Sequence, residues 1–282
     1  FGDGRDVVDL GWTRPCGTHP PRECGWYHGR MDDTHKFITF ASDLIGMSAE
    51  DRDEYALTLI IDLSRFTWIA DRLHQGMLEY LLVTRAMKMQ LGSMPELMAR
   101  GIEVDNSELY YWGISQGAIF GPTFMALSPD ITRGALGVAG NNYAMLMERS
   151  RNFTPFFTIL SSAYQARSDQ LIAEAAIQLL WDGTDGISYL RRVTSQPFEG
   201  HVAKHMLVDV ARGDHQVATV TTENAARSTI GLPILENYDT ERIVPLAETV
   251  PYPHVGNGLV NWSFGNPWAF AGNQPPSEDT ID

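Results

Sequence analysis

An uncharged stretch in the middle of the chain constrains its fold more than any other feature. No charged residue occurs between Glu108 and Asp130, and a run of that length is typical of a membrane-spanning helix. Its content argues against that interpretation, because it changes from an aromatic run to the glycine-containing turn Gly113-Ile-Ser-Gln-Gly117 and then to a helix-like run. The stretch therefore predicts a strand, a tight turn and a helix in immediate succession.

Short apolar runs separated by helix-like stretches predict the rest of the fold. Strands are predicted at residues 37–42, 109–112, 135–139, 205–211 and 258–262, and helices at residues 54–89, 94–100 and 118–127. Each strand run is nearly unbroken in apolarity, which is typical of parallel strands buried on both faces. The predicted class is α/β, with a doubly wound, mostly parallel sheet.

The predicted strands leave one long gap. Residues 1–140 and 201–282 are expected to form a single core domain, and residues 141–200 to form an insertion. That insertion contains helical patterns at residues 145–149 and 169–181 but no strand run. We expect it to form a helical lid over a pocket.

Charge and composition exclude several classes of protein. The chain has 21 Lys and Arg against 35 Asp and Glu, so its formal net charge is −14. Such a balance repels nucleic acid and anionic membrane surfaces. With 44% hydrophobic residues, the chain can bury a core large enough to offset its conformational entropy.

The amino-terminal region bears on localisation. Cys16 and Cys24, the only cysteines, lie in one Gly/Pro-rich loop. A disulfide between them would contribute roughly 2–3 kcal/mol and favours an extracellular or cell-envelope protein, with two free thiols as the alternative. The chain begins at Phe1 without a signal-peptide pattern, so we expect it to be processed or cut.

The turn Gly113-Ile-Ser-Gln-Gly117 matches the GxSxG pattern of a nucleophile elbow. A serine hydroxyl reacts well only when a tight turn exposes it, and flanking glycines keep Cβ atoms away from the adjoining strand and helix. Ser115 is therefore the candidate nucleophile. The backbone N–H of Gln116, at the start of the following helix, is the candidate oxyanion donor.

The acid and the base of a serine triad are expected later in the chain, in the order Ser, Asp, His. Asp214 follows the predicted strand at 205–211 and is the candidate acid, the alternative being a solvated aspartate in an ordinary turn. No histidine occurs from residue 255 to 282. We expect the base to lie beyond Asp282, with His254 as the fallback, because His215 is adjacent to Asp214 and adjacent side chains point apart.

These motifs resemble those of the α/β-hydrolase family of serine esterases and lipases. The resemblance covers residues 37 to about 262 and depends on the elbow and on Gly213-Asp-His-Gln-Val217. It implies that the segment Phe1-Gly-Asp-Gly4 is the tail of a loop that supplies a second oxyanion donor. The first strands of the sheet would then precede Phe1.

The predicted function is cleavage of carboxylic esters through an acyl-enzyme on Ser115, with no cofactor and no metal. An apolar acyl pocket is expected from the aromatic residues of the insertion, which are Phe153, Phe156, Phe157, Tyr164 and Trp181. The polar turn containing His28, Asp32, Asp33 and His35 lacks a metal-binding spacing. Alternatives are a non-catalytic binding protein or inactive fragment on the same fold, and a thioester or peptide hydrolase on the same triad.

Overall fold

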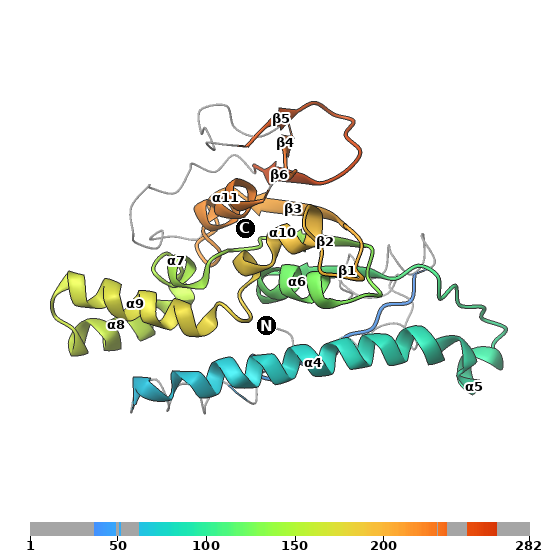
Figure 1. Ribbon diagram of the computed structural model, residues 1–282, viewed down its shortest axis with the longest axis horizontal. Coiled ribbons are helices and arrows are strands. Elements are labelled where there is room, and N and C mark those ends of the chain that lie inside the picture. The colour runs from blue at the N-terminus through green and yellow to red at the C-terminus, as the bar shows by residue number, and fades with distance from the viewer. Residues whose placement is uncertain (1–36, 49–50, 52–61, 230, 236–246, 264–282) are drawn as a thin grey trace, which may run out of the picture. The chain divides into compact units, whose positions relative to one another are not determined.

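A computed structural model describes residues 37–48, 51, 62–229, 231–235 and 247–263 of the chain (Figure 1). The chain divides into two compact units, residues 1–80 and 81–282. Helix α4 (Phe66–Gln90) spans the boundary between them. The predicted disulfide Cys16–Cys24, the polar turn at residues 28–35 and the segment at Phe1 lie outside the described residues.

In the first unit, a buried carboxylate ties a turn to helix α4. Asp51 accepts hydrogen bonds from the backbone N–H groups of Gly46 (2.7 Å) and Ser48 (3.1 Å) and from Arg72 Nε (2.9 Å). Burial acts to raise the pKa of Asp51, but the hydrogen bonds from Ser48 and Arg72 lower it below its usual value. The carboxylate thus stays charged and orders the turn.

The predicted strand at residues 37–42 is wrong. Residues 37–44 form neither helix nor strand. The run is apolar and β-branched, but strand propensity expresses itself only where a neighbouring strand offers backbone partners. The turn that follows is instead fixed by the side chain of Asp51.

The second unit contains a six-stranded parallel sheet in the order β1-β2-β3-β6-β4-β5. Its strands are β1 (Tyr110–Ile114), β2 (Arg133–Gly137), β3 (His205–Ala211), β4 (Ile234–Leu235), β5 (Thr249–Val250) and β6 (Gly258–Trp262). The strands β3 and β6 have the predicted bounds, and β1 and β2 lie within two residues of theirs. With flanking helices, this is the predicted α/β architecture.

Three helices pack against one face of the sheet. Helix α6 (Gln116–Leu127) contacts β1 and β2, and helices α10 (Leu190–Thr194) and α11 (Thr219–Ser228) contact β3. Burial alternates along β1 and β3, so the prediction that these strands are buried on both faces is wrong. Tyr110, Trp112, Ile114 and Leu207 share the exposed face, because the three helices cover only the other one.

Helix α6 lies unusually close to the sheet. A Cβ placed on Gly121 would come within 2.3 Å of Leu136 Cδ2, and one on Gly134 within 2.3 Å of Met125 Sδ. Glycines at these contacts let the helix backbone approach β2 directly. These contacts hold the middle and the last turn of α6 against β2.

The end of α6 is held by a buried lysine. Lys204 Nζ donates to the carbonyl oxygens of Met125 and Ser128. Burial lowers the pKa of the Lys204 amine to about 8. Nearby, Asp130 pairs with Arg85 (2.6 Å) and Lys88 (3.3 Å) from α4.

The segment between β2 and β3 is helical, as predicted for the insertion. It contains α7 (Tyr143–Met147), α8 (Thr154–Ala163), α9 (Arg167–Trp181) and α10. Helix α9 contacts both α7 and α8, and Figure 1 shows α8 and α9 side by side. The sequence predicted α7 and α9 but missed α8, α10 and α11.

In the described residues, no helix is long and apolar enough to cross a membrane. The uncharged stretch after Glu108 divides into β1 and α6, as its composition predicts.

Candidate active site

Ser115 connects the end of β1 to the start of α6 and has a strained backbone. Its φ is 52° and its ψ is −119°, a combination that non-glycine residues rarely adopt. The Ser115 N–H donates to the carbonyl of Gly137 (2.9 Å), and the Ser115 carbonyl accepts from the N–H groups of Ala118 and Ile119 (both 2.9 Å). The turn is therefore held firmly on both sides while its side chain remains at the surface of the sheet edge.

The two flanking glycines are not equivalent. A Cβ on Gly113 would lie 2.6 Å from the backbone carbon and oxygen of Gly117, a contact that neither atom can relieve. A Cβ on Gly117 would meet nothing closer than Tyr111 Oη at 3.7 Å. The prediction that both positions require glycine is thus confirmed for Gly113 and wrong for Gly117.

The first turn of α6 presents open hydrogen-bond donors. Within the described part of the chain, the backbone N–H groups of Gln116 and Gly117 have no acceptor, and no group bonds the Ser115 hydroxyl. The positive end of the helix dipole adds to these donors. The position predicted for an oxyanion donor at Gln116 therefore has the required free N–H.

The Gln116 side chain is held by the helical segment between β2 and β3. Tyr143 Oη donates to Gln116 Oε1 (2.8 Å), whereas the buried Gln116 Nε2 has no partner among the described residues. An unsatisfied amide donor in a protein interior costs about 1–3 kcal/mol unless a ligand or water meets it. A second open donor thus belongs to the residue that follows Ser115.

Tyr143 is fixed by aromatic packing and by a buried carboxylate. Its ring stacks on Trp181 (centroids 4.3 Å apart) and meets Phe153 edge-on (6.0 Å), and its N–H donates to Asp185 Oδ2 (2.7 Å). Burial raises the pKa values of both the Tyr143 phenol and the Asp185 carboxyl. The phenol therefore stays protonated and keeps donating to Gln116 at neutral pH.

Asp214 lies just past the carboxyl end of β3. Gly213 (φ 86°) makes the turn, and Asp214 Oδ1 accepts from the N–H groups of Gln216 (2.7 Å) and Val217 (2.8 Å). Ser115 and Asp214 occupy the same sheet edge because their strands are parallel. With β2 between them, the two strands are about 10 Å apart, which leaves room for an imidazole.

Three of the four histidines of the second unit lie away from this arrangement. His201, His205 and His254 lie at or before the amino ends of β3 and β6, at the edge opposite Ser115. His254 Nε2 is within 3.0 Å of the Asn257 carbonyl oxygen, so the fallback base is not brought to the elbow. His215 follows Asp214, and its carbonyl accepts from the Arg151 N–H.

Backbone strain is concentrated at this edge. In the described residues, Ser115 and Val138 (φ 52°) are the non-glycine residues with positive φ, and they follow the adjacent strands β1 and β2. Such strain costs on the order of 1–3 kcal/mol per residue and clusters at functional sites.

Asp209, on β3, has its Oδ1 near Gly137, and burial raises the pKa of this carboxyl to about 6.

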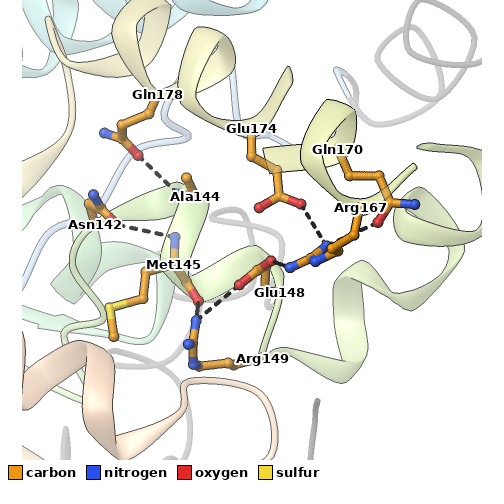
Figure 2. Close-up of polar contacts among 9 residues, drawn as sticks. All are labelled: Asn142, Ala144, Met145, Glu148, Arg149, Arg167, Gln170, Glu174 and Gln178. Atoms are coloured by element: carbon orange, nitrogen blue, oxygen red, sulfur yellow. Dashed lines mark hydrogen bonds and ion pairs between the residues drawn. The ribbon is translucent and has the colours of Figure 1, made fainter. Parts of the chain in front are cut away.

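A groove of about 540 Å³ lies between α7 and α9 (Figure 2). Its polar groups are paired with each other: Arg167 bridges Glu148 and Glu174, and Gln178 Oε1 accepts from the Ala144 N–H. None of the five aromatic residues expected to form an acyl pocket lines this groove. The buried Trp181 and the half-buried Phe153 pack around Tyr143 instead.

Sequence reasoning missed Tyr143, Asp185 and Val138. An aromatic residue after a strand gives no signal of what it will contact, and positive φ at a β-branched residue contradicts its propensity. In the described residues, no cluster of His, Cys, Asp and Glu could hold a metal ion.

Comparisons with known proteins add no assignment: no protein-family model matches the chain, and neither curated proteins nor solved structures provide a match.

Proposed function

We propose that this protein is a serine hydrolase of the α/β-hydrolase type that cleaves carboxylic esters through an acyl-enzyme on Ser115. The observation that carries the proposal is the strained backbone of Ser115 between a parallel strand and a helix, next to two N–H groups that have no acceptor among the described residues. A turn with only a structural role would relax at this position. Strain of about 1–3 kcal/mol persists where it serves a function.

In the proposed reaction, Ser115 Oγ attacks the ester carbonyl and loses its proton to a base. The N–H of Gln116 stabilises the negative charge that develops on the carbonyl oxygen. The tetrahedral intermediate collapses, the alcohol leaves with the proton from the base, and water then hydrolyses the acyl-enzyme by the same steps. Asp214, held by two backbone N–H groups, orients the base and stabilises its charged form.

The helical insertion would act as a lid that supports the elbow. Tyr143 links the packed residues Phe153 and Trp181 to the side chain of Gln116. Gln116 Nε2, which is buried, would hydrogen-bond a bound water.

The alternative is a non-catalytic hydrolase-fold protein. The specific observation in its favour is the position of the four histidines of the second unit, three of which lie at the wrong edge of the sheet while the fourth is adjacent to Asp214. Under this alternative, the same open donors would bind an anion or a carbonyl compound without turnover.

Hydrolysis of p-nitrophenyl acetate, butyrate and octanoate tests the proposal. With a parent chain that includes the base expected beyond Asp282, we expect turnover, a loss of at least about a thousandfold in Ser115→Ala and a loss of about a hundredfold or more in Asp214→Asn. The exposed Ser161, on α8, provides the matched control, and Ser161→Ala should keep full activity. A fluorophosphonate probe should label the parent but not Ser115→Ala.

Two outcomes would overturn the proposal. If all variants fold but none hydrolyses the esters or reacts with the fluorophosphonate probe, the non-catalytic alternative is favoured. Faster turnover of a matched thioester or p-nitroanilide than of the ester would keep Ser115 as nucleophile but replace the substrate class.

A further inference from the structure

The outward face of α9 carries a stripe of apolar side chains that no described residue of the second unit covers. Ile172 and Leu179 are 69% and 74% exposed, and Leu171 and Leu180 are 48% and 41% exposed. The opposite face of the helix is buried and includes Glu174, Ile177 and Trp181. Contiguous exposed apolar surface of this kind marks an interaction site.

The stripe has a symmetric sequence. Leu171 and Ile172 are followed at one-turn spacing by Ala175 and Ala176, and these in turn by Leu179 and Leu180. The order large-small-large reads the same in both directions about the midpoint of the two alanines. Two such helices can therefore pack antiparallel, with large residues of one copy opposite large residues of the other and the alanines allowing close approach at the centre.

The exposed face of α9 that carries the stripe has no charged side chain between Asp169 and Asp182. Glu174, the one charged residue between Asp169 and Asp182, lies on the buried side and pairs with Arg167. The polar groups that line the adjacent groove bond to each other, as Figure 2 shows. No charge on the stripe is left to select an oppositely charged partner.

The groove extends the stripe onto α7. Leu171, Ala175 and Leu179 from α9 line it together with Met145 from α7. Apolar side chains that flank the centre of an antiparallel helix pair would enter it. A second copy of the same chain thus finds both a complementary helix face and a recess beside it.

We propose that two copies of this chain associate through α9, antiparallel about a two-fold axis that passes between Ala175 and Ala176. The two-fold symmetry of the stripe favours a second copy as occupant, because a self-complementary surface is what a two-fold interface requires. A neutral lipid surface would accept an apolar stripe of any order. With four exposed large side chains per copy, the interface is at the small end, so the dissociation constant should lie in the micromolar range or above.

Sedimentation equilibrium of the full chain from about 1 μM to about 500 μM tests the interface. We expect the average mass to rise from that of a monomer toward that of a dimer as concentration increases. Ile172→Glu and Leu179→Glu should each raise the dissociation constant at least tenfold. Val255 lies outside α9 and its side chain is 95% exposed, so Val255→Glu should leave the dissociation constant unchanged. Unchanged thermal unfolding would show that the variants fold.

Mixing two variants tests the register. The proposed axis places residue 172 of one copy opposite residue 179 of the other, so Ile172→Lys mixed with Leu179→Glu should associate more tightly than either variant alone. Monomers at every concentration, or dimers that neither glutamate variant weakens, would overturn the proposal. Monomers that sediment with phosphatidylcholine vesicles, and lose that binding in Leu179→Glu, would show that α9 docks on a lipid surface instead. Failure of the mixture to associate would overturn the antiparallel register.

Discussion

The two ends of helix α6 differ in how their backbone groups are satisfied. At its end, Lys204 donates to two carbonyl oxygens, and the Ser128 N–H returns to Phe124 (2.8 Å). At its start, Ser115 gives no side-chain cap, and the N–H groups of Gln116 and Gly117 have no acceptor in the described chain. The difference teaches that, in the described chain, two open N–H donors stand at the amino end of α6, which is the end that the proposed chemistry uses.

The largest effect is expected at the strained start of the helix. Gly113→Ala would force a Cβ within 2.6 Å of the Gly117 backbone, and we expect a loss of about 4 kcal/mol or more in the free energy of unfolding. Gly117→Ala is the matched control, because its Cβ has room and alanine favours a helix. Chemical denaturation of both variants measures the difference. Equal losses would show that the elbow does not have the described geometry.

The second prediction concerns the satisfied end. Lys204→Met keeps the volume of the side chain but leaves the carbonyls of Met125 and Ser128 without their donor. We therefore expect the free energy of unfolding to fall by about 2–3 kcal/mol. Lys88→Met is the control, since Lys88 forms an ion pair nearer the surface and should change stability by less than about 1 kcal/mol. If both variants unfold at the same denaturant concentration, Lys204 does not hold the helix end.

The third prediction separates positioning from packing at the start of the helix. Tyr143→Phe keeps the stacking on Trp181 but removes the donor to Gln116 Oε1. We expect the free energy of unfolding to fall by about 1–2 kcal/mol. If the proposed esterase activity holds, kcat should fall while KM changes little. Tyr189→Phe, which loses a hydroxyl bond to the Gly183 carbonyl (2.7 Å), should lose stability without losing kcat. Equal kcat in the two variants would remove the positioning role.

The smallest effect should come from Asp209. Burial raises the pKa of its carboxyl from 3.8 to about 6, so the folded state binds a proton more tightly than the unfolded state. Stability from this group is therefore present below about pH 4 and is lost as pH rises to about 6. Asp209→Asn should raise the melting temperature at about pH 7.5 by up to about 3 °C and leave it unchanged near pH 4.

The exposed Glu199 gives the comparison for that measurement. Glu199→Gln makes the same kind of carboxyl-to-amide change at the protein surface. A gain of Asp209→Asn that is the same at the two pH values would mean that packing, and not titration, causes it.

Much of the sheet could be predicted from the sequence, because apolar runs bounded by turn residues specify buried strands. The bounds of β3 and β6 follow from such runs. The run at residues 37–42 has the same composition but no strand partner, and composition alone cannot supply one. The short strands β4 and β5, with two residues each, give no pattern to detect.

The site could be predicted in part. Ser115, Gln116 and Asp214 share one sheet edge, as their place after parallel strands implies. Tyr143 could not be found, because its contact with Gln116 joins residues 27 positions apart through a helix that only the folded chain places. The need for glycine at 113 but not at 117 likewise depends on distances between backbone atoms.

The hydrogen-bond pattern around Ser115 predicts a distinctive set of amide hydrogen-exchange rates for the turn. The N–H of Ser115 is bonded to Gly137, and those of Ala118 and Ile119 to Ser115, whereas the two between them, on Gln116 and Gly117, are open. Five consecutive amides should therefore exchange slow, fast, fast, slow and slow. A bound carbonyl oxygen would slow the middle pair alone, so occupancy of the site can be observed without any turnover.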